Sequence, residues 1–336
     1  MDDFIGYERK RNKRMIEIRV LKAHQGDCIW VRCISKKVIN IIIDAGPSTF
    51  KNNFINLIEE IEKNKEKIDL LFFSHIDDDH IKGCIKYLKG MKNKIIDKVW
   101  INGNGSKIYS DMQDHSASNV LSLVDLIKKN DIQIETPILE GDEFIFDGGK
   151  IEVIGPTESE MMKVATKIEN SNNIIREHAG YTYTGNISET KDEYHKDLSD
   201  TNNASIIMVV EFENKKLLFT GDSTSENIIR AVEKYYIDTV FDIVKLPHHG
   251  SPHNVSRKLI NKVKARKFIV CITKISTFLI LCDLAVCLAT LYVSFSLVFA
   301  LMRYLQGKVF LIRFYSPTTL SSSRAEFRLP SRLACA

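Results

Sequence analysis

The sequence predicts an α/β protein, and two observations support this fold class. Short apolar runs typical of buried strands alternate along the chain with segments of helical spacing. Polar residues capable of chemistry stand directly after several of these runs, which is where open α/β sheets place their sites. The chain has 336 residues, 44% of them hydrophobic and 27% charged. This length and composition are those of a folded protein with a sizeable core.

The first part of the chain predicts strands and helices in turn. Residues 15–22 alternate apolar and polar side chains, and residues 28–33 follow them across a Gly-Asp turn, so the two segments predict a hairpin. Residues 38–43 are a β-branched run typical of a strand covered on both faces. The remaining predicted elements of this part are a helix over 54–68, a strand over 68–73 and a helix over 81–88.

The second part of the chain predicts two further hairpins, around residues 147–149 and around residues 213–216. Residues 157–203 lie between them and are polar and too long for an ordinary connection. This segment is interpreted as an insertion that faces substrate or as a mobile loop. The other predicted elements are helices over 120–129 and 228–236 and a strand over 243–246.

The segment from His75 to His80 carries most of the chemical information. Its six residues hold two His and three Asp, directly after a buried apolar strand. Such groups would be costly in a core unless divalent cations compensated their charge. Imidazole nitrogen together with carboxylate oxygen suits zinc, with manganese or iron as alternatives. The competing interpretation is a polar helix start with Asp78 or Asp79 as its cap, but a cap needs one Asp rather than a His-flanked cluster.

The stretch SHIDDDHIKG (74–83) resembles the His-x-[His/Asp]-x-Asp-His signature of the metallo-β-lactamase superfamily. Further stretches follow in the family's order: Asp44-Ala45-Gly46 after a strand, LLFTGDS (217–223) and VKLPHHGS (244–251). With LKAHQGDCIWV (21–31) and NNASIIMV (202–209), the pattern is closest to the ComEC-like competence-protein metallo-hydrolase branch. The resemblance implies an αβ/βα four-layer sandwich over residues 15–273. The composition after residue 273 leaves open whether the C-terminal half of that sandwich is complete.

The resemblance also implies a site with two metal ions. The implied metal ligands are His75, Asp77, Asp79, His80, Asp222 and His249. Asp222 is expected to bridge the two ions, and either His of the tandem pair could be the ligand, with His249 favoured. Asp79 and His248 are expected to take part in catalysis. His248 would contact either the substrate phosphate or one of the metal ligands. Asp44 and Asn202 are expected to contact the ligand side chains rather than the metal ions.

Two departures from the family pattern concern the first metal. Asp77 stands where many members have His, and Thr201-Asn202-Asn203 stands where the family's third motif supplies a His. An Asn carbonyl, or a loop histidine such as His178 or His195, could take that place.

The resemblance therefore implies a metal-dependent hydrolase that cleaves phosphodiester bonds, of a nucleic acid or a nucleotide, with a metal-activated water. Two divalent ions are expected, with zinc favoured and manganese as the alternative. The competing function is a binding or membrane-tethered module that keeps a metal without hydrolysing anything. Charge does not indicate a nucleic-acid partner, since residues 1–267 carry 40 Lys+Arg against 41 Asp+Glu.

Residues 274–336 form an apolar tail of different composition. Residues 268–336 contain no Asn, and residues 284–302 are 19 consecutive uncharged and mostly apolar residues. A membrane anchor, a reading-frame change or fusion, and an apolar helix packed on the domain all fit this tail. Residues 1–14 are a basic arm without a signal peptide, so a cytoplasmic protein is expected, with membrane association possible only through the tail. No feature of the sequence indicates an oligomeric state.

Overall fold

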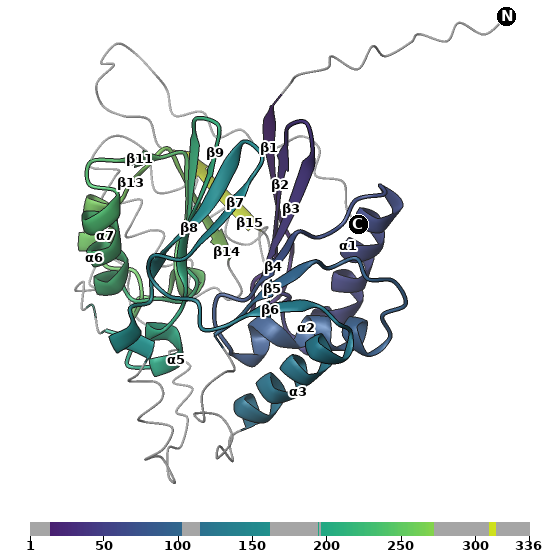
Figure 1. The fold of residues 1–336 in the computed structure, drawn as a ribbon. Helices are drawn as coiled ribbons and strands as arrows, with labels where there is room; N and C mark the ends of the chain where they lie inside the picture. Colours follow the sequence, from purple (N-terminus) through teal and green to yellow (C-terminus); the bar gives the residue numbers. More distant parts are fainter. Residues whose placement is uncertain (1–13, 103–114, 162–193, 195, 272–308, 314–336) are drawn as a thin grey trace, which may run out of the picture.

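The computed structural model describes residues 14–102, 115–161, 194, 196–271 and 309–313. Their strands form two large mixed sheets that face each other, with helices on the outer side of each sheet (Figure 1). The α/β class predicted from the sequence is therefore confirmed.

The first sheet has the strand order β1-β2-β3-β4-β5-β6. Its first three strands pair antiparallel, and the next three continue parallel to β3. The strands are β1 (Met15–Val20), β2 (Ile29–Ile34), β3 (Val38–Ile43), β4 (Leu70–Phe72), β5 (Lys98–Trp100) and β6 (Gln133–Glu135). The helices of this half are η1 (Ser48–Phe50), α1 (Lys51–Lys63), α2 (Asp78–Lys89) and α3 (His115–Lys129).

The second sheet has the strand order β15-β14-β12-β10-β9-β8-β7, and β11 and β13 form a separate parallel pair. The strands of the large sheet are β7 (Glu143–Phe146), β8 (Gly149–Gly155), β9 (Ile207–Phe212), β10 (Lys215–Phe219), β12 (Ile243–Lys245), β14 (Lys267–Cys271) and β15 (Val309–Arg313). The small pair consists of β11 (Val240–Phe241) and β13 (Lys264–Ala265). The helices of this half are α5 (Asp200–Asn203), α6 (Ser225–Tyr235), η4 (His248–Gly250) and α7 (Arg257–Lys262).

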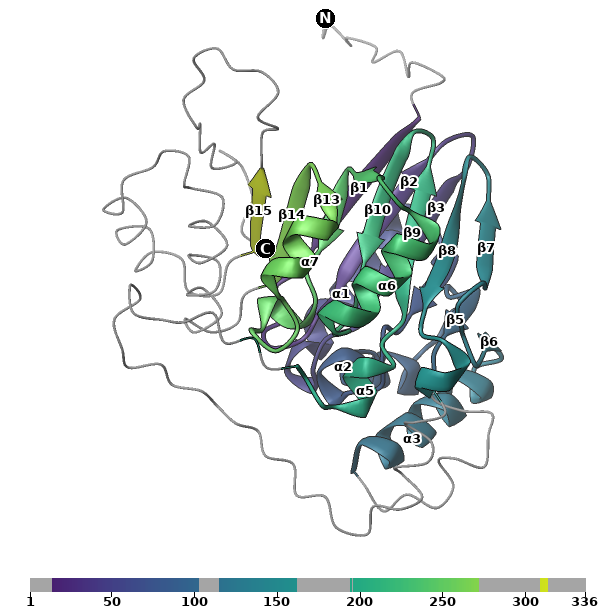
Figure 2. The same cartoon turned by 90° about the vertical axis from the view of Figure 1, so that its left-hand side faces the viewer.

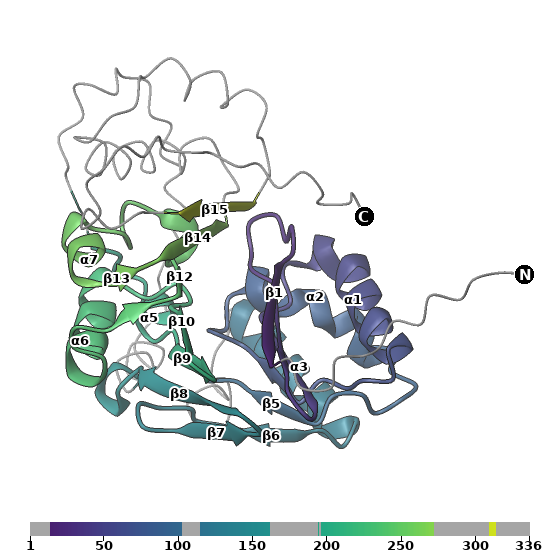
Figure 3. The ribbon, with the colours of Figure 1, turned by 90° about the horizontal axis from the view of Figure 1, so that it is seen from above.

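The view from above shows four layers (Figure 3), and three hydrophobic clusters of the described residues hold them together. The first cluster packs α1, α2 and α3 on the outer face of the first sheet. The second lies between the two sheets, and the third packs α6 and α7 on the outer face of the second sheet. Successive side chains of a strand point to opposite faces of the sheet. In β3, Ile41 and Ile43 therefore pack in the middle cluster, while Ile42 packs in the first. The αβ/βα four-layer sandwich is therefore the observed architecture.

The predicted elements correspond closely to the observed ones. The three predicted hairpins are β1–β2, β7–β8 and β9–β10, and β3 has the bounds predicted for it. The strands β5 and β6 were not expected, because each is three residues long and shows no period of its own. The helix α7 was also not expected, since its six residues are largely polar.

One strand of the apolar tail belongs to the second sheet, where β15 pairs antiparallel with β14 at its edge (Figure 2). The predicted span at 284–302, the arm up to residue 13 and most of the 157–203 insertion lie outside the described residues. Among the helices that the structure does describe, none has the length and apolar character needed to cross a membrane.

Glu140 ties α6 to the connection between β6 and β7. Its carboxylate pairs with Lys234 and accepts hydrogen bonds from Arg230 Nη1 at 2.7 Å and Tyr235 Oη at 2.8 Å. Burial raises the pKa of Glu140, but these three partners outweigh burial and lower it to about 2. The folded state therefore favours the ionised form more than the unfolded chain does.

Glu140→Gln is expected to lower the free energy of unfolding at pH 7 by roughly 1 kcal/mol, because the cluster is partly screened by solvent. Since the pKa is lower in the folded state, this contribution is complete above the ordinary pKa near 4.5 and is lost as the pH falls through about 2. Urea unfolding at pH 7 and pH 3 tests this, with the exposed Glu59→Gln as control. If wild type and Glu140→Gln differed in unfolding free energy by the same amount at pH 7 and at pH 3, the role given to the ionised Glu140 would be wrong.

Candidate metal centre

Four loops meet at the carboxyl ends of parallel strands and bring the predicted site residues together. Asp44 follows β3 and the segment 74–80 follows β4, so both come from the first sheet. Asp222 follows β10, and the tandem pair His248–His249 follows β12, so both come from the second sheet. The site thus lies where the ends of the two sheets meet, at the position that α/β sheets favour for chemistry.

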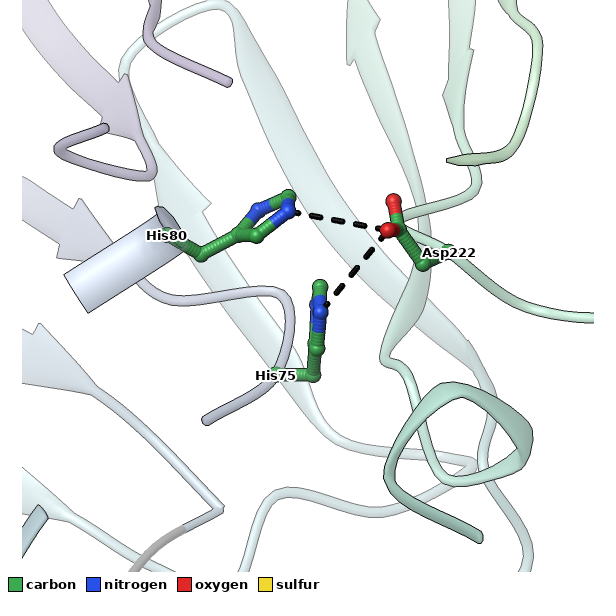
Figure 4. A group of neighbouring side chains, drawn as sticks. All are labelled: His75, His80 and Asp222. Atoms are coloured by element: carbon green, nitrogen blue, oxygen red, sulfur yellow. Dashed lines mark ion pairs between the residues drawn. The ribbon is translucent and has the colours of Figure 1, made fainter. Parts of the chain in front are cut away.

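His75 and His80 point toward Asp222 from the opposite sheet (Figure 4). Their Nε2 atoms lie 3.8 and 3.6 Å from Oδ2 of Asp222. These distances are too long for hydrogen bonds, but they suit a nitrogen and an oxygen that bind one ion at about 2.0–2.2 Å each. All three side chains are buried. The group therefore has the atoms and the spacing of a metal site.

Asp44 positions both His75 and His80 through hydrogen bonds. Its carboxylate accepts hydrogen bonds from the backbone N and the Oγ of Ser74, each at 2.7 Å, and lies 2.9 Å from Nδ1 of His80. Because the Ser74 hydroxyl donates to Asp44, it accepts from Nδ1 of His75 at 3.0 Å. Both imidazoles then carry a proton on Nδ1 and face Asp222 with Nε2, the atom that would bind a metal ion. Asp44 thus contacts His80 directly and His75 through Ser74.

The site contains several buried polar atoms that have no hydrogen-bond partner within the described residues. These atoms are His75 Nε2, Asp77 Oδ1, His80 Nε2, Asp222 Oδ1, and both Nδ1 and Nε2 of His249. Each buried polar atom without a partner costs about 1–3 kcal/mol. Such a concentration of unsatisfied imidazole nitrogens and carboxylate oxygens fits divalent cations, which would bind one nitrogen of each ring and the carboxylate oxygens.

The candidate ligand atoms of the described residues form two overlapping groups, and a third group consists of Asp27, Asp44 and His80, in which Asp44 already holds Ser74 and His80 by hydrogen bonds. His75, His80 and Asp222 each offer one ligand atom, and these atoms lie within 4.8 Å of one another. Asp79, His80 and His249 form a second group on the same criterion. Asp77 extends the first group, with its Oδ2 3.9 Å from Nε2 of His75. The arrangement therefore offers places for two ions, and His80 belongs to both groups.

The tandem histidines point in different directions because both have left-handed backbone conformations, with φ of 43° at His248 and 54° at His249. The His249 side chain is buried and belongs to the second group. The His248 side chain is 36% exposed, and its Nε2 lies 3.8 Å from Oδ2 of Asp222. Its Nδ1 lies 2.9 Å from Asn254 Oδ1 and 3.4 Å from Asp197 Oδ2.

Electrostatic effects in the cluster follow from burial and from the mixture of acids and imidazoles. Burial alone raises the pKa of Asp222, but His248, His80 and His75 outweigh it and hold that pKa well below its usual range. Burial lowers the pKa of His80, yet Asp44 and Asp222 raise it well above its ordinary value. For His249 burial prevails and lowers the pKa, which favours the neutral imidazole that a metal requires.

Asp78 and Asn202 lie near the proposed ligands but bind other side chains. Asp78 does not cap α2, whose N-cap is Asp77 without a side-chain capping bond. Instead Asp78 pairs with Lys82 at 2.6 Å and accepts from Asn119 at 2.9 Å. Asn202 is buried next to His248, with its Nδ2 3.5 Å from His248 Nδ1 and 2.7 Å from Asp197 Oδ2. The loop histidines His178 and His195 lie outside the described residues.

The structure adds residues that the sequence interpretation did not assign. Asp27 and Lys245 form a buried ion pair beside His249, and Asp197 and Asn254 hold His248. Asp27 and Lys245 stand inside the motif stretches LKAHQGDCIWV and VKLPHHGS, which is the one signal that could have pointed to them. Asp197 lies in the polar insertion, where nothing distinguishes it from its neighbours.

Comparison with known proteins gives similarity of structure only. No family model matches the sequence, and no curated protein matches it. Among solved structures, the chain is similar to a diphosphatase of the PhnP family, with 15% identity over 73% of this chain and 72% of that one and a TM-score of 0.36. It is also similar to CmlA, a diiron β-hydroxylase from Streptomyces venezuelae, with 11% identity, a TM-score of 0.37, and coverage of 70% of this chain and 34% of CmlA. A third similar structure is Zn²⁺-bound PqqB from Methylobacterium extorquens, with 11% identity, a TM-score of 0.33, and coverage of 65% of this chain and 58% of PqqB.

Proposed function

We propose that this chain is a metal-dependent hydrolase of phosphodiester-type substrates that uses two divalent ions. The observation that carries the proposal is the set of unsatisfied nitrogen and oxygen atoms that four loops bring together at the sheet ends. The first ion would be held by His75, Asp77 and Asp222. The second would be held by Asp79, His80 and His249, with Asp222 between the two.

When bound, divalent ions lower the pKa of water toward neutrality and stabilise negative charge on the attacked centre. The residues of this chain prepare that chemistry by fixing the ligands in advance. Asp44 and Ser74 set the tautomers of His75 and His80, so no rearrangement is needed when a cation arrives. His248 is the most exposed of the four site histidines, and its Nδ1 is held by Asn254. We assign it the contact to a phosphoryl oxygen of the substrate.

The phosphodiester class is supported by the donor set and by the motifs. Three carboxylates stand among the proposed ligands, so the site is richer in oxygen than an all-histidine zinc site. Such a set accepts zinc and also manganese. The stretches SHIDDDHIKG and VKLPHHGS resemble the ComEC-like metallo-hydrolase branch, and we propose that the chain belongs to it. The near-neutral charge of residues 1–267 favours a small phosphodiester or a strand end over a long duplex.

Asp79→Asn is expected to reduce hydrolysis of bis-p-nitrophenyl phosphate by at least about a hundredfold, because it removes a charged ligand of the second ion. Asp78→Asn is the matched control, since it changes the same charge one residue away and touches Lys82 and Asn119 rather than the ligands. We expect the control to stay within about twofold of wild type, and a chelator to abolish the wild-type activity. A wild type that binds metal but is inert toward several ester classes would overturn the proposal in favour of a binding module.

A further inference from the structure

Asp27 and Lys245 form an ion pair that is buried behind the metal cluster. Asp27 lies in the turn between β1 and β2 of the first sheet, and Lys245 is the last residue of β12 in the second. Their exposed fractions are 1% and 2%, and Nζ of Lys245 contacts Oδ2 of Asp27. Burying two charges costs several kcal/mol for each ion, and an apolar pair of similar size is often at least as stable. Stability alone therefore does not explain a charged pair at this position.

The pair touches two of the loops that carry candidate ligands. Oδ1 of Asp27 lies 3.6 Å from Nδ1 of His249. Nζ of Lys245 donates a hydrogen bond to the carbonyl oxygen of Gly221 at 3.3 Å, and Gly221 directly precedes Asp222. The lysine thus contacts the backbone that carries one proposed ligand, while the aspartate faces the ring of another.

The same turn also packs against the third ligand loop. A Cβ placed on Gly26, the residue before Asp27, would lie 1.7 Å from the carbonyl oxygen of Asp79. Only glycine allows the turn to approach Asp79 so closely. One turn of the first sheet therefore contacts the backbone of Asp79, the ring of His249 and, through Lys245, the backbone before Asp222.

Two alternative roles for Asp27 fit these contacts less well. A direct metal ligand needs its negative charge available, whereas Oδ2 of Asp27 is already in contact with an ammonium group. A purely structural pair would have no reason to face Nδ1 of an otherwise unsatisfied histidine. A carboxylate on the far nitrogen of a metal-binding imidazole is a recurrent way to orient the ring and fix its tautomer.

We propose that Asp27 and Lys245 are a positioning pair for the second metal ion. Through its charge, 3.6 Å from Nδ1 of His249, Asp27 favours the tautomer that carries its proton on Nδ1 and presents Nε2 to the ion. Lys245 neutralises Asp27 and fixes the Gly221 carbonyl before Asp222. The inference rests on the proposed function in one respect, namely that an ion is held by Asp79, His80 and His249.

The test compares Asp27→Asn/Lys245→Met with wild type in the full-length chain. The double variant removes both charges, so neither is left buried without its partner. The matched control is Arg32→Met/Glu66→Gln, which removes a partly buried pair from the first sheet, with Nε of Arg32 3.1 Å from Glu66 Oε2. Metal-free protein is titrated with Co²⁺ alone, and the absorption of the bound ion reports each site. The ¹⁵N shifts of His249, measured without metal, report its tautomer.

We expect the double variant to bind the second Co²⁺ about 10–100-fold more weakly and the first ion as wild type does. We also expect His249 to lose its preference for the Nδ1-protonated tautomer, while the control pair changes neither readout. Wild-type affinity for both ions together with an unchanged tautomer would overturn the inference. Complete loss of the second ion in Asp27→Asn, with tighter binding in Lys245→Met, would also overturn it by making Asp27 a direct ligand. The tautomer readout needs no metal, so failure of the proposed function and failure of this inference can be told apart.

Discussion

Asp222→Ala is expected to remove both metal ions and to lower hydrolysis by at least about a thousandfold. The reason is the central place of this carboxylate, whose Oδ2 lies 3.8 Å from Nε2 of His75, 3.6 Å from that of His80 and 3.8 Å from that of His248. Without it, three imidazoles in a buried site lose the negative charge that they share. Loss of metal-based charge stabilisation is worth several kcal/mol in the transition state.

The measurement is metal content after dialysis together with initial rates at saturating Zn²⁺ or Mn²⁺. Asp242→Ala is the matched control. Asp242 precedes β12, at the amino end of the strand whose carboxyl end carries the site, and accepts a hydrogen bond from the backbone of Lys216. If Asp222→Ala kept two ions and near-normal rates, the bridging role assigned to Asp222 would be wrong.

Gly83→Ala is expected to destabilise the fold by about 3 kcal/mol or more, although alanine normally favours a helix over glycine by about 1 kcal/mol. Gly83 lies in α2 against the turn that follows β3, where its N–H donates to the carbonyl of Gly46 at 2.8 Å. A Cβ at this position would lie 1.8 Å from the carbonyl oxygen of Ala45. Because that contact is with backbone, the helix must move away from the turn.

The movement should also weaken metal binding. Ala45 donates its N–H to the carbonyl of His80 at 2.8 Å, so the turn and the helix position Asp44 and His80 together. Gly90→Ala is the matched control on the same helix, since a Cβ there would meet nothing closer than 3.8 Å. Urea unfolding of both variants, with and without Zn²⁺, tests the prediction. Equal stability of the two variants would show that α2 does not depend on this close approach.

Much of the fold could be predicted because its main strands are covered on both faces. The run at 38–43 is apolar except for Asn40, and in the structure its alternate apolar residues serve two different cores. The predicted cluster was also local, since His75 to His80 follow one strand end within six residues. Such short-range arrangements depend on chain geometry alone, so a pattern of residue types is sufficient to indicate them.

The remainder depends on long-range contacts that leave no local pattern. Asp27 stands in a motif stretch, but nothing in that stretch indicates that its partner is Lys245 on the other sheet. The orientation of the tandem histidines follows from two consecutive left-handed residues at 248 and 249, a conformation that non-glycine residues adopt rarely. Sequence alone therefore left open which histidine faces which group, and it gave no sign that Asp197 supports His248.

Anomalous diffraction from crystals grown with Zn²⁺ or Mn²⁺ would show whether the sheet ends hold two divalent ions. Data collected on both sides of the metal absorption edge would locate each ion without reference to activity. The account predicts two peaks, one among His75, Asp77 and Asp222 and the other among Asp79, His80 and His249. An absence of peaks at saturating metal, with Nε2 of both His75 and His80 satisfied by water or by protein groups, would contradict it.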